Sequence, residues 1–135
     1  MKTNDYKELK VWQKAMDLTE EIYRLSDQMP KSEIYGLIDQ MKRAAISIPS
    51  NIAEGAGRWS DKDFVRFLSI SRGSLLELET QLILCNRLNF IDSHKISIVK
   101  SKIVEINKMI NSLINFRLNS HTIKEPNTDP IPPNT

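Results

Sequence analysis

Residues 47–55 read Ser-Ile-Pro-Ser-Asn-Ile-Ala-Glu-Gly and lie in a segment, residues 33–57, whose apolar residues recur at steps of three and four. That spacing places the apolar side chains on one face of a helix. Pro49 removes a backbone donor and clashes with the preceding turn, so we expect a kinked helix, with a break into two helices as the alternative. Gly55 and Gly57 predict its end. The apolar face consists of Leu37, Met41, Ala44, Ile48 and Ile52.

The same periodicity occurs in three other segments, residues 8–28, 60–88 and 93–118. Four helices joined by short connections pack most simply as an antiparallel up-down-up-down bundle. We therefore predict an all-α fold, with residues 1–118 as a four-helix bundle domain. Residues 119–135 hold four of the six prolines and few apolar residues. This composition predicts a disordered or loosely attached tail.

Local signals predict where the helices begin and end. Ser32 is placed to cap the second helix, and Ser60 is followed by acidic residues at the start of the third. Serine hydroxyls at these positions accept hydrogen bonds from the first free backbone N–H groups. Asn89 predicts the end of the third helix, because asparagine tolerates the left-handed conformation found there. Either Asp92 or Ser93 opens the fourth.

The composition is that of a globular domain. Of 135 residues, 40% are apolar and 27% are charged, and 19 Lys and Arg against 17 Asp and Glu give a net charge of +2. This balance excludes a strongly basic histone-like chain but allows a local basic patch. No run of about 20 apolar residues could span a membrane, and no apolar run follows the first lysine as in a leader peptide. We expect a cytoplasmic protein without membrane contact.

Residues that could support catalysis or bind a metal are few. The chain has one cysteine, Cys85, and two histidines, His94 and His121, and neither histidine follows a Glu at the spacing of di-iron helical bundles. Cys85 continues an apolar stripe, which indicates a core residue rather than a nucleophile. The Gly55 to Gly57 pair lacks the lysine of a phosphate loop. We predict no metal, no cofactor and no enzymatic activity.

One side of the second predicted helix carries a polar row. Two interpretations remain open: a row that contacts a ligand or phosphate through Arg43, Asn51, Glu54 and Arg58, or a structural face with local ion pairs and contacts between helices. The spacing alone does not decide between them. The full row is Gln40, Arg43, Ser47, Asn51, Glu54 and Arg58.

The fourth predicted helix is locally basic, with five Lys and Arg residues against the single Glu105 between residues 93 and 118. Such a helix could hold a nucleic-acid backbone, since phosphate contacts supply most non-specific affinity. An ordinary lysine-rich surface is the alternative. No aromatic residues alternate with the lysines, so the helix does not resemble a base-stacking surface. The candidate nucleic-acid contacts are Lys95, Lys100, Lys102 and Lys108.

The apolar arcs of the first two helices are wider than one bundle interior requires. Surplus apolar surface in a globular protein usually marks a partner surface. We therefore expect a homo-oligomer. The alternative is a well-packed monomer in which Trp12 and Tyr23 are partly exposed.

The chain contains Glu-Ile-Tyr-Gly-Leu at 33–37, Gln-Met-Lys-Arg-Ala-Ala at 40–45 and the stretch at 47–55. These motifs, with further matches at 9–15 and 62–80, resemble one bacterial family, the four-helix bundle proteins encoded in intervening sequences of 23S ribosomal RNA genes. The resemblance implies an antiparallel bundle that assembles as a homopentamer. Related accessory variability determinant proteins of diversity-generating retroelements form basic pentameric barrels that bind nucleic acid and a reverse transcriptase.

No catalytic residue or established activity comes with the resemblance. Together with the basic fourth helix, it predicts a non-enzymatic homo-oligomer that binds RNA or DNA, or an RNA-associated protein. The alternative is a protein-binding scaffold without affinity for nucleic acid.

Overall fold

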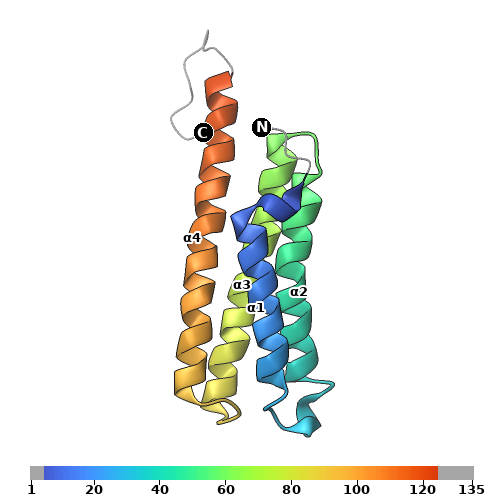
Figure 1. Ribbon diagram of the computed structural model, residues 1–135, viewed down its shortest axis with the longest axis vertical. Coiled ribbons are helices and arrows are strands. Elements are labelled where there is room, and N and C mark those ends of the chain that lie inside the picture. The colour runs from blue at the N-terminus through green and yellow to red at the C-terminus, as the bar shows by residue number, and fades with distance from the viewer. Residues whose placement is uncertain (1–4, 125–135) are drawn as a thin grey trace.

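The computed structural model describes the backbone of residues 5–124 and the side chains of residues 5–119. This part of the chain is all-helical, and consecutive long helices run antiparallel in the predicted up-down-up-down order (Figure 1). The last turns of α4 extend past the other helices (Figure 1). The elements are the 3-10 turn η1 (Tyr6–Glu8), α1 (Lys10–Ser26), the 3-10 turn η2 (Lys31–Glu33), α2 (Leu37–Ala56), α3 (Asp61–Arg87) and α4 (Ser93–Lys124).

The structure excludes one alternative and moves one predicted helix end. Helix α2 passes through Pro49 without a break, which excludes the alternative of two separate helices, while the kink stays a prediction. Helix α4 continues to Lys124, beyond the predicted end at Leu118. The start of the predicted tail, residues 119–124, is therefore helical, and residues 125–135 lie outside the described part of the chain.

The connection between α3 and α4 follows the local signals. Asn89 has φ 63°, the left-handed conformation expected after a helix. The Phe90 N–H donates to the Cys85 carbonyl at 2.9 Å and the Asn89 N–H to the Asn86 carbonyl at 3.0 Å, which together form a Schellman motif. Asp92, rather than Ser93, caps α4, because its carboxylate accepts the Lys95 N–H at 3.0 Å.

The other two predicted caps differ in outcome. Ser60 caps α3 as predicted, its hydroxyl accepting the Asp63 N–H at 3.1 Å. The prediction for Ser32 was wrong: the N-cap of α2 is Gly36, which makes no side-chain cap bond. Ser32 lies instead in η2, where the Ile34 N–H donates to the Lys31 carbonyl at 3.1 Å. This extra turn moves the start of α2 downstream.

The predicted stripes form the hydrophobic core. Cys85 is fully buried in it, with its sulfur 3.4 Å from the sulfur of Met41 and 3.9 Å from that of Met29. Each long helix contributes a continuous row of buried side chains, so the core runs along the bundle. The largest fully buried residues are Leu18, Ile22, Met41, Ile48, Ile52, Leu68, Leu75, Leu78, Leu82, Ile103, Ile106 and Ile110.

Pro49 leaves one carbonyl of α2 without its helical partner, and α1 supplies a substitute. The missing N–H of Pro49 would have bonded to the Ala45 carbonyl. The Thr19 hydroxyl lies 3.0 Å from that oxygen and 2.9 Å from the Ala15 carbonyl, so it can donate to either. On the other side, the buried Ser71 hydroxyl of α3 donates to the Ile48 carbonyl at 2.8 Å. Hydroxyls from two helices thus hold the proline turn.

Gly55 lies inside α2 and does not end it; Gly57 is the C-cap. A Cβ on Gly55 would come 2.7 Å from Phe67 Cβ and 2.8 Å from Phe64 Cδ1. The glycine is therefore required for the close packing of α2 on α3, not for a special backbone conformation.

We predict that Thr19→Val lowers the free energy of unfolding by about 1 kcal/mol, because the Ala45 carbonyl loses its donor. In a Pro49→Ala background the restored N–H can bond to that carbonyl, so the same substitution should cost less than half as much. Urea denaturation of the four proteins at one protein concentration measures this cycle. Equal costs in both backgrounds would show that the hydroxyl does not compensate for the proline.

We predict that Gly55→Ala lowers the free energy of unfolding by about 2–3 kcal/mol, because the added methyl group forces α2 away from α3. Gly57→Ala is the matched control. Its Cβ would meet only backbone oxygens at 3.6 and 3.8 Å. Its effect should stay within about 0.5 kcal/mol. Equal stability of the two variants, measured by denaturant titration, contradicts the packing role of Gly55.

Candidate functional site

The four lysines proposed as nucleic-acid contacts lie in different surroundings. Lys102 forms an ion pair with Glu21 of α1 at 3.6 Å, and the Lys95 ammonium donates to the side chain of Gln28 in the turn after α1. Neither Lys100 nor Lys108 has an ion-pair partner among the described residues.

The helical repeat also separates these lysines. With about 100° between successive residues, Lys100 and Lys102 are about 160° apart around α4, and Lys108 lies about 120° from Lys102. Lys95 and Lys102 are about 20° apart around α4, whereas Lys108 lies farther along the helix, near the start of α1. The structure therefore does not bring the four lysines onto one face, and their contact with nucleic acid stays a prediction.

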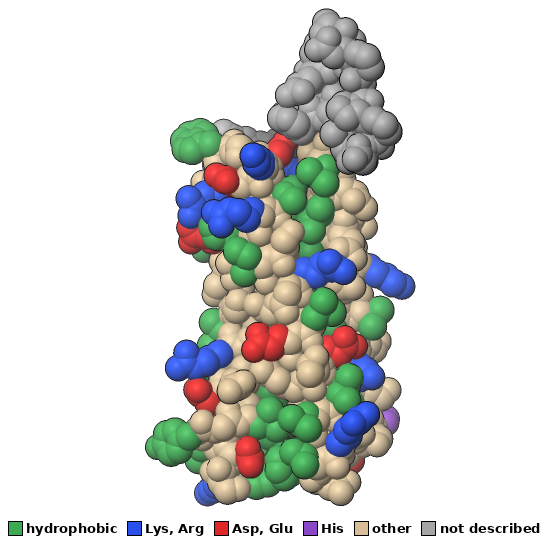
Figure 2. Space-filling model, turned by 180° about the vertical axis from the view of Figure 1, so that it is seen from behind, with side chains coloured by type: hydrophobic (Ala, Val, Ile, Leu, Met, Phe, Trp, Pro, Cys, Tyr) green, Lys and Arg blue, Asp and Glu red, His purple; other side chains and the backbone are tan. Residues whose placement is uncertain are grey.

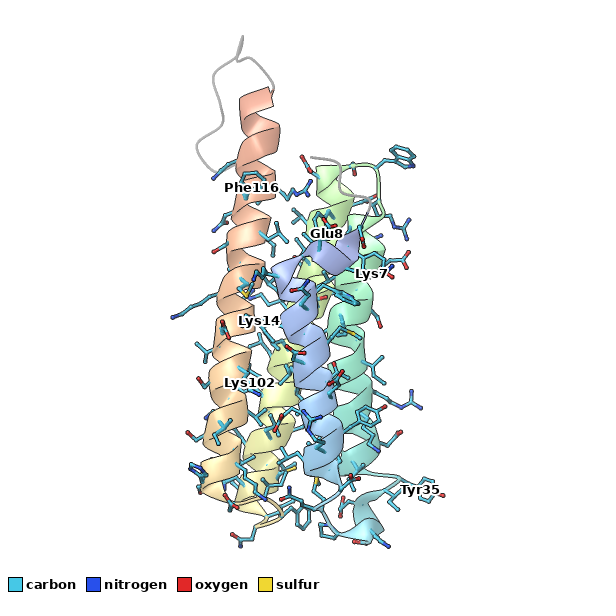
Figure 3. All side chains as sticks on the ribbon, in the orientation of Figure 1. Lys7, Glu8, Lys14, Tyr35, Lys102 and Phe116 are labelled. Atoms are coloured by element: carbon cyan, nitrogen blue, oxygen red, sulfur yellow. The ribbon has the colours of Figure 1, made fainter. Side chains whose placement is uncertain are left out.

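Ion pairs occupy the seam between α1 and α4. Lys14 of α1 contacts Glu105 of α4 at 3.2 Å, and Lys14 and Lys102 both lie along this seam (Figure 3). The Arg24 guanidinium and, more weakly, the Lys102 ammonium hold the pKa of the Glu21 carboxyl below its usual value. Of the basic residues of α4, Lys102 thus pairs with an acidic side chain of α1 and Arg117 with Asp61 of α3, whereas Lys14 of α1 pairs with the acidic Glu105 of α4.

The polar row of α2 divides into local ion pairs and a contact between helices. Glu54 pairs with Arg58 at 2.7 Å, and Arg43 pairs with Asp39 at 3.0 Å. Asn51 donates to the Ser47 hydroxyl at 2.9 Å, and that hydroxyl lies 2.8 Å from the Ser74 hydroxyl of α3. These contacts account for Arg43, Asn51, Glu54 and Arg58 structurally; a ligand-binding role for them stays a prediction.

Residues with catalytic or metal-binding potential are not brought together. Burial raises the pKa of the Cys85 thiol to about 11, which keeps it protonated at neutral pH. His94 is exposed at the start of α4, and the side chain of His121 lies outside the described residues. Within the described part of the chain, no three His, Cys, Asp or Glu side chains are grouped to hold a metal ion. Its helices are also too short or too polar to cross a membrane.

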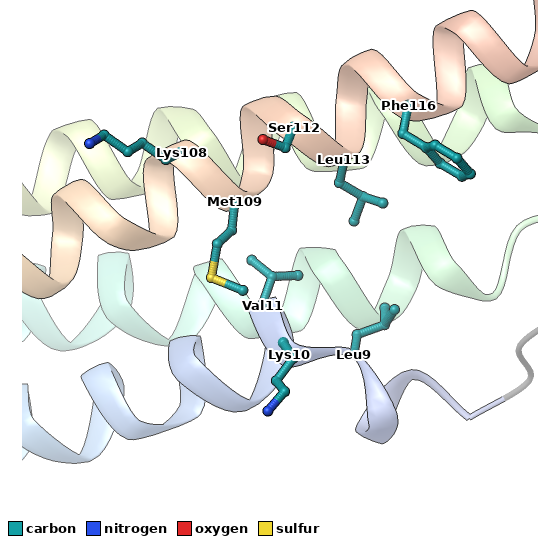
Figure 4. A pocket seen from close by; sticks show the side chains of 8 residues that line it. All are labelled: Leu9, Lys10, Val11, Lys108, Met109, Ser112, Leu113 and Phe116. Atoms are coloured by element: carbon teal, nitrogen blue, oxygen red, sulfur yellow. The ribbon is translucent and has the colours of Figure 1, made fainter.

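An apolar groove of about 450 Å³ lies between the start of α1 and the second half of α4 (Figure 4). Phe116 at its edge is 63% exposed. Helices α1 and α4 contact each other less extensively than the other neighbouring helices do, which leaves this groove open. The helical stripe did not predict it, because Phe116 lies off the buried face. The lining residues are Leu9, Lys10, Val11, Lys108, Met109, Ser112, Leu113 and Phe116.

Helix α3 exposes apolar side chains along its outer face. Hydrophobic side chains appear along much of the rear face of the bundle, with a broad patch at the lower end (Figure 2). Gly73 is exposed in the middle of the helix, and a Cβ there would meet nothing within 4 Å. The exposed large apolar residues are Ile70, Leu76, Ile83 and Leu84 of α3 and its C-cap, Leu88.

The turn between α2 and α3 combines cationic and aromatic side chains. Trp59 is 96% exposed. The guanidinium carbons of Arg58 and Arg66 lie 4.8 and 4.6 Å from the centre of the Phe67 ring. In the sequence, Arg58 belongs to the polar row of the second helix, whose spacing does not include an aromatic residue. The signal that could have revealed this cluster is the adjacency of Arg58 and Trp59 in a predicted turn.

Comparison with known proteins identifies relatives of the same fold. A crystal structure of a protein of unknown function from the S23 ribosomal protein family of Bacteroides thetaiotaomicron is similar, with 27% sequence identity and a TM-score of 0.72. The similarity covers 77% of this chain and 97% of that one. No curated protein matches the chain. The family model described as 23S rRNA-intervening sequence protein matches residues 7–112. The chain therefore belongs to the 23S rRNA-intervening sequence protein family.

Proposed function

We propose that this chain is a non-enzymatic, self-assembling helical bundle that binds RNA or an RNA-associated protein. The partner in self-assembly is a second copy of the chain, and the expected assembly is the homopentamer that the family resemblance implies. The observation that carries this proposal is the outer face of α3, where apolar side chains surround an exposed glycine.

Gly73 supports an interface because nothing within the described chain explains it. A glycine inside a helix costs roughly 0.5–1 kcal/mol relative to alanine. At Gly55 the packing of Phe64 and Phe67 offsets that cost, whereas a Cβ on Gly73 would point into open space. Close approach of another backbone is the usual reason for such a glycine. A helix of a second copy, packed over Gly73 and Ile70, supplies that approach and covers apolar surface.

Nucleic-acid binding is supported by cations that no acidic side chain neutralises. Lys62, Arg66, Lys100 and Lys108 have no ion-pair partner among the described residues. Assembly multiplies these charges by the number of copies, and several weak phosphate contacts on one particle combine into measurable affinity.

The alternative function is a protein-binding scaffold without affinity for nucleic acid. The groove between α1 and α4 favours this function, because most of its lining is hydrophobic, with Lys10, Lys108 and Ser112 as its polar members. Binding of labelled RNA and DNA to the full chain at about 50 mM salt separates the two functions. Affinity that falls steeply with salt supports the nucleic-acid binder, and no binding at low salt leaves the scaffold.

We predict that the wild-type chain has a solution mass near five chains and that Gly73→Leu shifts it to the monomer. The larger side chain should keep neighbouring copies apart without unfolding the bundle, because leucine at an exposed helical position is a better helix former than glycine. Light scattering after size exclusion measures the mass, and circular dichroism confirms folding.

Glu20→Leu is the matched control, since it also places a leucine at an exposed position in a long helix, here α1. It should leave the assembly intact. A monomeric wild-type chain would overturn self-assembly, and an intact assembly of the Gly73→Leu variant would overturn the role of the outer face of α3.

A further inference from the structure

We propose that the turn between α2 and α3 is a binding surface for single-stranded nucleic acid, in which a base stacks on Trp59 and phosphates contact Lys62 and Arg66. This inference rests on the proposed function and locates its nucleic-acid contacts. It places them away from the lysines of α4 that the sequence singled out.

The first support is the exposure of the indole. Trp59 is 96% exposed, although tryptophan buries a large apolar area in most folded proteins. It lies between the C-cap Gly57 and the N-cap Ser60, so the two helix ends that flank it have fixed positions. A nucleobase stacks on an aromatic side chain regardless of its identity, because every base has a π face. An indole presented to solvent on a short turn is suited to that contact.

The second support is the charge beside it. Lys62 and Arg66 are four residues apart on α3, so they lie on one side of the helix about 6 Å apart along its axis. Two neighbouring carboxylates are already neutralised, that of Asp61 by Arg117 at 2.9 Å and that of Glu54 by Arg58 at 2.7 Å. Among the nearby acidic groups, the half-buried Asp63 opposes the remaining positive charge. Lys and Arg side chains gather at the upper left of the rear view, with Asp and Glu side chains beside them (Figure 2).

The third support is the way Phe67 orders the arginines. Both Arg58 and Arg66 place their guanidinium groups over this ring, at 4.8 and 4.6 Å from its centre. A cation held against an aromatic ring has fewer conformations to lose when it binds a phosphate. Phe67 itself is held by its contact with α2 at Gly55.

These features select single strands over duplexes. A base that is paired in a duplex has its faces covered by its neighbours, so the indole gains a stacking partner only from an unpaired base. The phosphate contacts alone do not distinguish the two forms. A duplex should therefore bind through the cations only.

The test uses the full chain, a labelled 12-nucleotide oligo(U), the corresponding oligo(dT) and a 12-base-pair duplex, with fluorescence anisotropy at about 50 mM salt. We expect Trp59→Ala to weaken single-strand binding at least fivefold and to leave duplex binding unchanged. We expect Lys62→Ala/Arg66→Ala to reduce the steepness with which the logarithm of single-strand affinity falls with the logarithm of salt concentration. The slope should change by about 1.4, or about 0.7 for each lost phosphate contact.

Tyr35→Ala is the matched control, because Tyr35 is a second aromatic side chain, 95% exposed, before the start of α2 at the opposite end of the bundle (Figure 3). It should not change binding. In a Trp12→Phe background, the emission of Trp59 alone should be quenched by oligo(U). Circular dichroism and solution mass confirm that each variant keeps the fold and assembly.

Three results overturn the proposal in distinguishable ways. Unchanged single-strand affinity of Trp59→Ala removes the stacking surface but leaves nucleic-acid binding standing. If the Lys100→Glu/Lys108→Glu variant loses binding and the Lys62→Ala/Arg66→Ala variant keeps wild-type affinity, the binding site lies on α4 instead. Absence of any binding by the wild-type chain removes both this surface and the nucleic-acid part of the proposed function.

Discussion

The bundle depends on how a proline is accommodated in the middle of α2. A buried carbonyl that loses its hydrogen bond destabilises a fold by about 1–3 kcal/mol, so the Ala45 oxygen needs a donor from outside its own helix. Thr19 of α1 offers a hydroxyl at 3.0 Å, and Ser71 of α3 bonds to the neighbouring Ile48 carbonyl at 2.8 Å. Because side-chain hydroxyls reach only short distances, both bonds restrict the positions of α1 and α3 along the bundle axis relative to α2.

The alignment of α2 with α3 also positions the turn that follows α2. Six residues after the proline, Gly55 lets Phe64 and Phe67 pack directly on the backbone of α2. Phe67 then lies beside Arg58 and Arg66. A constraint in the bundle interior therefore determines which side chains the end of the bundle displays.

The sequence predicted the four helices because each long helix has an uninterrupted apolar stripe, and it predicted Ser60 and Asn89 because their capping bonds involve only residues close in sequence. Ser32 failed as a cap because η2 comes before α2, and a 3-10 turn of three residues has no periodicity to detect. The lysines of α4 could not be assessed from composition, since the acidic partner of Lys102 lies on α1 and Glu105 of α4 pairs with Lys14 of α1. The sequence thus predicted contacts between residues close in the chain, but not the ion pairs between helices.

Gly55 and Gly73 show why the interaction surfaces need the structure as well as the sequence. Both are glycines inside long helices, so the same residue at the same kind of position carries the same cost in helix stability. Only the distances from a Cβ separate them: at Gly55 two phenylalanines of the same chain occupy the space, and at Gly73 nothing does. A glycine whose space is filled by its own chain explains the bundle. At Gly73 the space for a side chain is open and the neighbouring side chains are exposed and apolar. This glycine therefore supports the proposed assembly, in which a helix of a second copy packs against it.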